Sequence, residues 1–285
     1  MKNNFFFITG KGGSGKSTIS SLLALELSKK NPVLLISMDS AHSLSSIWET
    51  DKIPEKSVEP GGSIRIFEPD FDLWIKKTSQ KSKRLLKKKY RFLDAFSVGK
   101  FIDLLVNSPG IEDQAIWEAA ADEIKKHTGS VVIDAPPTGQ AIKLIKNAIH
   151  TVKWTKEFSD LQNELSRMWT NLQNISHDQL SSGTETKKIT QKALKRALIV
   201  DNFIKTARFI FVRNSSPLSI SEEKLFSENL GKTVSNFISL QNFSSKESNI
   251  GEDLLSIENY GSHISGIKLL EDVLEINKTV FKKII

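Results

Sequence analysis

Short, almost uninterrupted apolar runs alternate along the chain with longer stretches in which apolar residues recur at helical spacing. Strands that are apolar on both faces are typical of a parallel sheet with helices on both sides. The pattern therefore predicts an α/β fold with a doubly wound, mainly parallel sheet. The runs that predict its strands are Phe5–Thr9, Val33–Ser37, Ile64–Phe67, Val131–Ile133, Phe209–Val212 and, as a sixth candidate, Phe237–Leu240.

The stretches between these runs differ in length. Ser17–Lys29 carries a broad apolar face and predicts the first helix, which Asn31-Pro32 would end. Residues of about 70–128 and 147–205 are helical in pattern and exceed what a simple crossover between strands needs. We expect residues 1–285 to form a single domain whose helical insertions make a subdomain beside the sheet.

Composition removes several classes of site. The 285 residues include no cysteine, which excludes disulfide scaffolds, thiolate zinc sites, iron–sulfur clusters and cysteine nucleophiles. No apolar run reaches the roughly 18 residues that a membrane span needs. The apolar run Phe5–Ile8 near the start is shorter than a signal-peptide core. We therefore expect a cytoplasmic globular protein.

The positive charge is concentrated in one place. Lys76–Arg91 contains nine basic and no acidic residues, so the rest of a chain of net charge +7 sums to −2. Only seven of the 40 basic residues are arginine, the side chain that favours bidentate base contacts, so a specific nucleic-acid interface is not expected. Two interpretations of the run stay open: a solvated helix face, or a patch for anionic lipid, nucleic acid or an acidic partner.

A glycine-rich motif directly follows the first strand and opens the first helix, the context in which a phosphate-binding P-loop is found. Glycine lets the backbone wrap closely around phosphate oxygens, with N–H groups turned inward at a helix N-terminus. Lys16 would meet the β- and γ-phosphates, and the Ser17 hydroxyl would ligate Mg²⁺. We therefore expect ATP or ADP with Mg²⁺ on Gly12, Gly13, Ser14, Gly15, Lys16, Ser17 and Thr18.

Lys11 is a second lysine inside this loop. With it the motif resembles the KGGxGK[ST]T pattern of the deviant Walker-A ATPases, which include the arsenite-pump ATPase and the ATPase that targets tail-anchored membrane proteins. The resemblance implies a homodimer in which Lys11 reaches the partner's nucleotide. It would supply in trans the charge that an arginine finger supplies elsewhere.

Two later segments resemble the switch loops of the same branch. Met38–Ser45 is similar to the DPAHNLSD switch I, with Ser40 in place of proline and Ser43 in place of asparagine. It implies that Asp39 is a water-positioning or magnesium-linked aspartate, and we expect it to orient the attacking water. For His42 a structural and a chemical role both stay open. Asp134–Gly139 resembles the DTAPTGH switch II, which implies that Asp134 contacts the magnesium shell.

Three further correspondences extend the resemblance over most of residues 5–245. Ser108–Asp113 is similar to the PGIDE element of the branch, and Ser219–Glu222 to its LSxxE stretch. Asn242 follows the last predicted strand, where the branch keeps an asparagine that faces adenine.

The departures from the branch narrow the function. Without cysteine, neither a zinc clamp between subunits nor a thiolate arsenite site can form. Phe92–Val106 and Trp154–Leu172 fit either an apolar groove that binds a membrane-protein client or a buried helix core. Leu270–Ile285 fits either a closing helix or a segment that binds a membrane surface.

The resemblance implies a Mg²⁺-dependent ATPase that acts as a nucleotide-gated homodimeric switch on a membrane protein or membrane partner. It would be cytoplasmic or peripheral at a membrane. One alternative is a positioning ATPase that binds lipid or DNA, like the division-site and chromosome-partition relatives. Another is a nucleotide-binding structural protein with negligible turnover.

Overall fold

The structure is a computed structural model. It describes residues 4–39, 43–49, 57–58, 63–70, 73–76, 80, 111–176, 184–231, 233–234, 236–244, 255–258, 260 and 264–285. Several predicted features lie outside these residues: most of Lys76–Arg91, all of Phe92–Val106, His42 with its two preceding neighbours, and Ser108–Gly110.

The described strands form one eight-stranded sheet in the order β3-β4-β2-β5-β1-β6-β7-β8. Its pairs are parallel except for β3, which runs antiparallel to β4. The predicted α/β fold with a mainly parallel sheet is therefore confirmed. The strands are β1 (Phe5–Gly10), β2 (Val33–Ser37), β3 (Ser57–Val58), β4 (Ile64–Phe67), β5 (Ser130–Asp134), β6 (Arg208–Arg213), β7 (Phe237–Ser244) and β8 (Leu255–Glu258).

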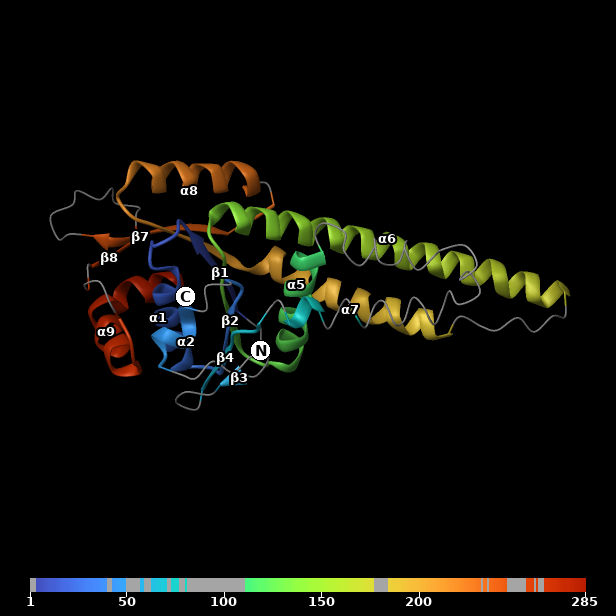
Figure 1. The fold of residues 1–285 in the computed structure, drawn as a ribbon, viewed down its shortest axis with the longest axis horizontal. Helices are drawn as coiled ribbons and strands as arrows, with labels where there is room; N and C mark the ends of the chain where they lie inside the picture. The colour runs from blue at the N-terminus through green and yellow to red at the C-terminus, as the bar shows by residue number, and fades with distance from the viewer. Residues whose placement is uncertain are drawn as a thin grey trace.

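Helices cover both faces of the sheet (Figure 1). One face carries α1, α2 and α9, and the other carries α5, α6, α7 and α8. The bounds are α1 (Lys16–Ser28), α2 (Ser43–Ile47), α5 (Ile111–Lys126), α6 (Thr138–Ser176), α7 (Thr184–Thr206), α8 (Pro217–Leu230) and α9 (Ile267–Ile284). None of these described helices combines the length and apolarity needed to cross a bilayer.

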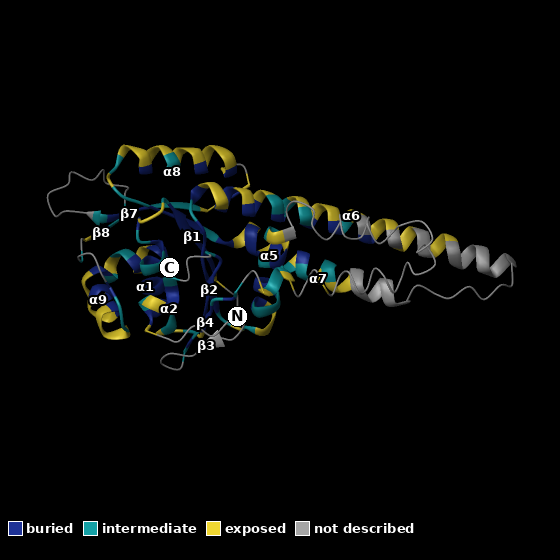
Figure 2. Cartoon of the chain, viewed as in Figure 1, coloured by how far each residue is buried: buried dark blue, intermediate teal, exposed yellow. Residues whose placement is uncertain are grey.

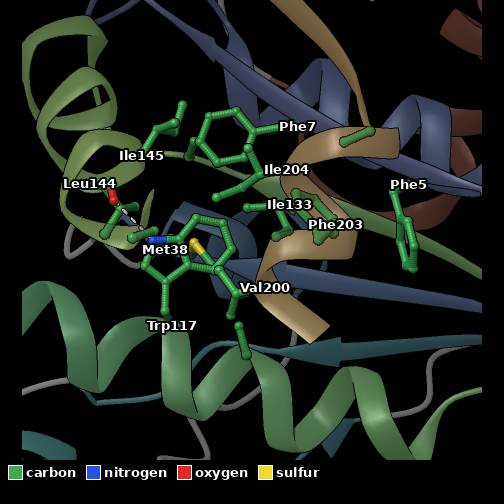
Figure 3. Packing of buried hydrophobic residues seen from close by; sticks show 14 of the residues in the cluster. Phe5, Phe7, Met38, Trp117, Ile133, Leu144, Ile145, Val200, Phe203 and Ile204 are labelled. Carbon is green, nitrogen blue, oxygen red and sulfur yellow. Dashed lines mark hydrogen bonds between the residues drawn. The ribbon is translucent and has the colours of Figure 1, made fainter. Parts of the chain in front are cut away.

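Side-chain alternation along β1 supplies both cores. Phe5 and Phe7 join the cluster on the α5–α8 face, whereas Phe6 and Ile8 join the cluster on the α1 face. Figure 3 shows the first cluster, in which the indole N–H of Trp117 donates to the Leu144 carbonyl (3.1 Å). Because every residue of β1 is buried, the strand reads as a continuous apolar run and fixes the loop that follows it.

The edges of the sheet differ from the sequence-based expectation. The short edge strands β3 and β8 were not among the predicted runs, and β7 extends past Leu240 to Ser244, so Asn242 lies inside a strand. Edge strands pair on one side only and need no long apolar run, which explains why the pattern misses them.

Helices α6 and α7, which lie side by side, cover most of residues 147–205. Helix α6 is continuous over 39 residues, and with α7 it extends well beyond the sheet (Figure 1). Solvent-exposed residues alternate with buried ones along the half of α6 that lies closest to the sheet (Figure 2). The division of the chain into one domain with insertions at 70–128 and 147–205 stays a prediction.

Candidate nucleotide site

The glycine-rich loop connects β1 directly to α1, as the sequence predicts. Gly15 precedes the helix with φ of +85°, a left-handed conformation that L side chains rarely adopt. A Cβ at this position would lie 2.3 Å from Nδ2 of Asn242, so the site requires glycine for space as well. The loop backbone is thereby pressed against β7.

The motif lysine is almost completely buried. The Lys16 ammonium group lies 3.4 Å from the Lys11 carbonyl oxygen, which also accepts a hydrogen bond from the Ser14 N–H (3.1 Å). The ammonium group thus folds back over the loop whose amides would hold phosphate. Ser14 Oγ is buried and has no hydrogen-bond partner within the described part of the chain.

Asp134 ends β5 between the two strands that lead into the P-loop and switch I. Its register partners are Ile8 on β1 and Ser37 on β2. The side chain is fully buried, and the Ser20 hydroxyl donates to its Oδ1 (3.0 Å). The other oxygen, Oδ2, has no hydrogen-bond partner among the described residues.

Burial raises the pKa of Asp134 from its ordinary value of 3.8 to about 6. The Ser17 hydroxyl, the Lys16 charge and the Ser20 hydroxyl act in the opposite direction, and the Asp39 charge raises the pKa further. A buried carboxylate with one open oxygen, next to a serine hydroxyl, suits Mg²⁺, which prefers oxygen ligands and retains water. Ser17 and Asp134 therefore fit the predicted ion.

Switch I starts at the carboxyl end of β2, next to Asp134. The Met38 N–H donates to the Asp134 carbonyl (2.8 Å), and Asp39, which follows, is half-buried. The hydroxyls of Ser17 and Ser43 lie 2.8 Å apart, so the first residue of α2 contacts the P-loop serine. His42 lies outside the described residues.

Glu68 is a polar contact that the sequence analysis missed. One carboxylate oxygen accepts the Leu44 N–H and the other accepts the Ser45 N–H, both at 3.1 Å. Glu68 directly follows β4, at the same sheet edge as Asp39 and Asp134. A carboxylate placed directly after a strand was the available signal.

Switch II links the sheet edge to two helices. The Thr9 hydroxyl donates to the Pro136 carbonyl (3.0 Å), and the Thr138 hydroxyl donates to Glu222 on α8 (2.6 Å). Thr138 is also the first residue of α6. The loop after Asp134 is therefore tied to β1 and, through Thr138, to α8.

Asn242 reaches the P-loop from β7. Its amide donates to the Ser14 carbonyl and to the Tyr260 hydroxyl, each at 2.9 Å, while its Oδ1 has no partner in the described part of the chain. Burial raises the pKa of Tyr260, whereas its hydrogen bonds to Asn242 and Thr18 act to lower it. The sequence analysis did not single out Tyr260. The adenine-facing role of Asn242 stays a prediction.

The geometry thus brings Lys16, Ser17, Asp39 and Asp134 together at the carboxyl ends of the central parallel strands. A sequence profile of the anion-transporting ATPases matches residues 3–240. The chain belongs to the anion-transporting ATPase family. The resemblance drawn from the P-loop and switch motifs is confirmed at this level.

Several curated proteins are similar to this chain over part of their length. "Putative arsenical pump-driving ATPase 2" of Aquifex aeolicus is 32% identical over 164 residues, covering 56% of this chain and 54% of the relative. "ATPase ASNA1 homolog" of Plasmodium yoelii yoelii is 27% identical over 237 residues (81% and 60%). "ATPase get3" of Schizosaccharomyces japonicus is 30% identical over 174 residues (58% and 52%). The chain spans between about half and 60% of the length of these relatives.

Proposed function

We propose that this member of the anion-transporting ATPase family is a Mg²⁺-dependent ATP hydrolase that works as a nucleotide-gated homodimer. The observation that carries the proposal is the Asp134 carboxylate, buried at the sheet edge with one oxygen open and in electrostatic contact with Lys16. Burial of an ionised carboxylate costs free energy unless a charged or polar ligand pairs with it.

The chain's own residues divide the work. The loop amides and Lys16 hold the phosphates, and Ser17 and Asp134 hold Mg²⁺, the latter through water. Asp39 orients the attacking water. When bound, Mg²⁺ supplies neutralisation of the charge that develops on the phosphoryl oxygens. Catalysis then consists mainly of positioning and electrostatic stabilisation.

Lys11 supplies the reason for a dimer. In this chain the backbone carbonyl of Lys11 already accepts from Lys16 and Ser14. We assign the Lys11 ammonium group to the nucleotide of the partner subunit, where a second positive charge assists transfer of the γ-phosphoryl group to water.

A stripe of apolar side chains on α6 supports a membrane-protein client. Trp154, Leu161 and Met168 are 62%, 50% and 52% exposed, and their seven-residue spacing places them on one helix face. Of the two interpretations of Trp154–Leu172, these three side chains favour a binding surface over a buried core. An apolar helical segment of a membrane protein would match such a face.

The positioning alternative receives less support from the C-terminal helix. Most of the apolar side chains of this helix pack within the fold: Leu270, Val273, Leu274, Phe281 and Ile284 of α9 are buried, whereas Ile276 is exposed. Of the two interpretations of Leu270–Ile285, this packing favours the closing helix.

Phosphate release by the purified chain tests the hydrolase. We expect turnover that requires Mg²⁺ and is lost in Lys16→Ala and Asp39→Asn. Lys224→Ala and Asp272→Asn, exposed side chains on α8 and α9, should keep it. Turnover that survives in Lys16→Ala, or that persists in excess chelator, would contradict the proposal.

An aggregation-protection assay with a single transmembrane segment tests the client. We expect the double variant Trp154→Ser and Leu161→Ser to lose protection while hydrolysis continues. Ile276→Ser, an equally exposed apolar residue on α9, is the matched control. Equal protection by all three proteins would exclude the α6 stripe as the client surface.

A further inference from the structure

The short helix α2 is fixed at its beginning by a carboxylate from another strand. The N–H groups of Leu44 and Ser45 belong to the first turn and have no partner within the helix. The two oxygens of Glu68 accept them, and the negative charge also suits the positive end of the helix. Glu68 is partly buried, so solvent screens this contact less than a surface pair.

The position of this first turn decides where Ser43 lies. Ser43 begins α2, and its hydroxyl is 2.8 Å from the Ser17 hydroxyl of the P-loop. A serine that ligates Mg²⁺ gives a lone pair to the ion, so its proton needs another acceptor. Ser43 Oγ is in place to accept a hydrogen bond from the Ser17 hydroxyl.

The far end of α2 is held independently. The Gly266 N–H donates to the Ile47 carbonyl (2.8 Å), and the Trp48 indole donates to the Ser21 hydroxyl (2.9 Å). The Ser265 hydroxyl donates to Glu49 (2.8 Å). Loss of Glu68 would therefore free the end of α2 that faces the nucleotide and leave the other end attached.

We infer that Glu68 is a positioning residue of the nucleotide site: it holds the first turn of α2 so that Ser43 Oγ accepts a hydrogen bond from the Ser17 hydroxyl when that hydroxyl ligates Mg²⁺. The inference rests on the proposed function and deepens it, because it links the end of β4 to the magnesium side of the site. Glu68 acts through Ser43 and touches neither nucleotide nor ion.

Binding of a fluorescent ADP analogue, measured in excess Mg²⁺ and in excess chelator, tests this role. In Glu68→Gln an amide NH₂ faces one of the two backbone donors, so the shape is kept but one charge-assisted hydrogen bond is lost. We expect Mg²⁺-dependent binding about tenfold weaker, with binding in chelator unchanged. Ser43→Ala should show the same pattern, and the double variant should be no weaker than either single variant.

Glu123→Gln is the matched control. Glu123 pairs with Arg65 of β4 (3.0 Å), so this change also removes a carboxylate contact at β4 but leaves α2 untouched. Hydrogen exchange provides the second readout: the Leu44 and Ser45 amides should exchange faster in Glu68→Gln and not in Glu123→Gln. Should Glu68→Gln not fold, Glu68→Asp, which is too short to reach both amides, takes its place.

Two results would overturn the inference. One is unchanged Mg²⁺-dependent binding in Glu68→Gln; the other is an equal loss with and without Mg²⁺, which would assign Glu68 to folding alone. If the unsubstituted chain binds no adenine nucleotide at all, the proposed function itself fails, and the exchange of the two amides still reports whether Glu68 holds α2.

Discussion

Burial of the Asp134 carboxylate costs free energy, which the Ser17 and Ser20 hydroxyls and the Lys16 charge offset only in part. The pKa of Asp134 in the folded chain, about 6, lies above the ordinary value of 3.8 because the carboxyl group is fully buried. Between these two values the folded chain binds more protons than the unfolded chain. Its free energy of unfolding therefore falls as the pH rises from about 4 to about 6, and the penalty is fully present above that range.

The variant Asp134→Asn removes this titration. Relative to the variant, the nucleotide-free chain should lose up to about 3 kcal/mol of stability between pH 4 and pH 7, the value of two pKa units. Denaturant unfolding at several pH values measures the difference. Parallel pH profiles would show that the Asp134 carboxyl group titrates normally.

Gly15 offers a second test at single-residue resolution. Gly15→Ala must adopt a positive φ and place a methyl group against Asn242, so we expect it to lower the free energy of unfolding by about 2 kcal/mol or more. Gly12→Ala is the control for stability, because a Cβ there meets no atom within 4 Å. Thermal unfolding compares them; equal melting temperatures would contradict the described loop geometry.

At the level of elements, α6 and α8 are joined by a hydrogen bond close to the site. Thr138→Val should reduce the free energy of unfolding by about 1 to 2 kcal/mol, because the Thr138 hydroxyl bonds a carboxylate in a partly buried setting. Lys146→Ala, which removes the exposed bond to Asn229 between the same two helices, should change it by less than about 0.5 kcal/mol. Denaturant unfolding of both variants measures these changes. A larger effect of Lys146→Ala would show that the exposed hydrogen bond, and not the Thr138–Glu222 bond, holds α6 to α8.

The elements that the sequence predicts well are those with a single physical cause. The central strands are apolar because both faces are covered, and α1 starts within one residue of the predicted position. Strands β3 and β8 were missed because an edge strand of two to four residues has no distinctive pattern. Pairing with an already formed neighbour determines them.

The candidate site divides in the same way. Asp39 and Asp134 were found because each lies at or just after the end of a buried strand, inside a recognisable motif. Glu68 carries the same signal, a carboxylate directly after a strand, but its partners are backbone N–H groups, which no sequence motif marks. Tyr260 reaches Asn242 only through tertiary structure, so no local pattern announces it.

For the whole molecule, the decisive prediction concerns two copies of the chain. If Lys11 acts on the partner's nucleotide, Lys11→Ala and Lys16→Ala should each be inactive alone. A mixture should recover about one quarter of the activity, because half of randomly assembled dimers are mixed and each holds one complete site. A phosphate-release assay on mixed proteins measures this. No recovery on mixing, despite confirmed exchange of subunits, would place Lys11 within its own subunit's site.

Helix α6 begins four residues after Asp134 and continues without a break for 39 residues. At about 1.5 Å per residue its axis is about 58 Å long, roughly twice the thickness of a bilayer core. A tilt of about 10° at its base would displace its tip by about 10 Å, if the helix moves as a rigid rod. An event of ångström size at the phosphates would thus be amplified into a displacement as wide as a helix.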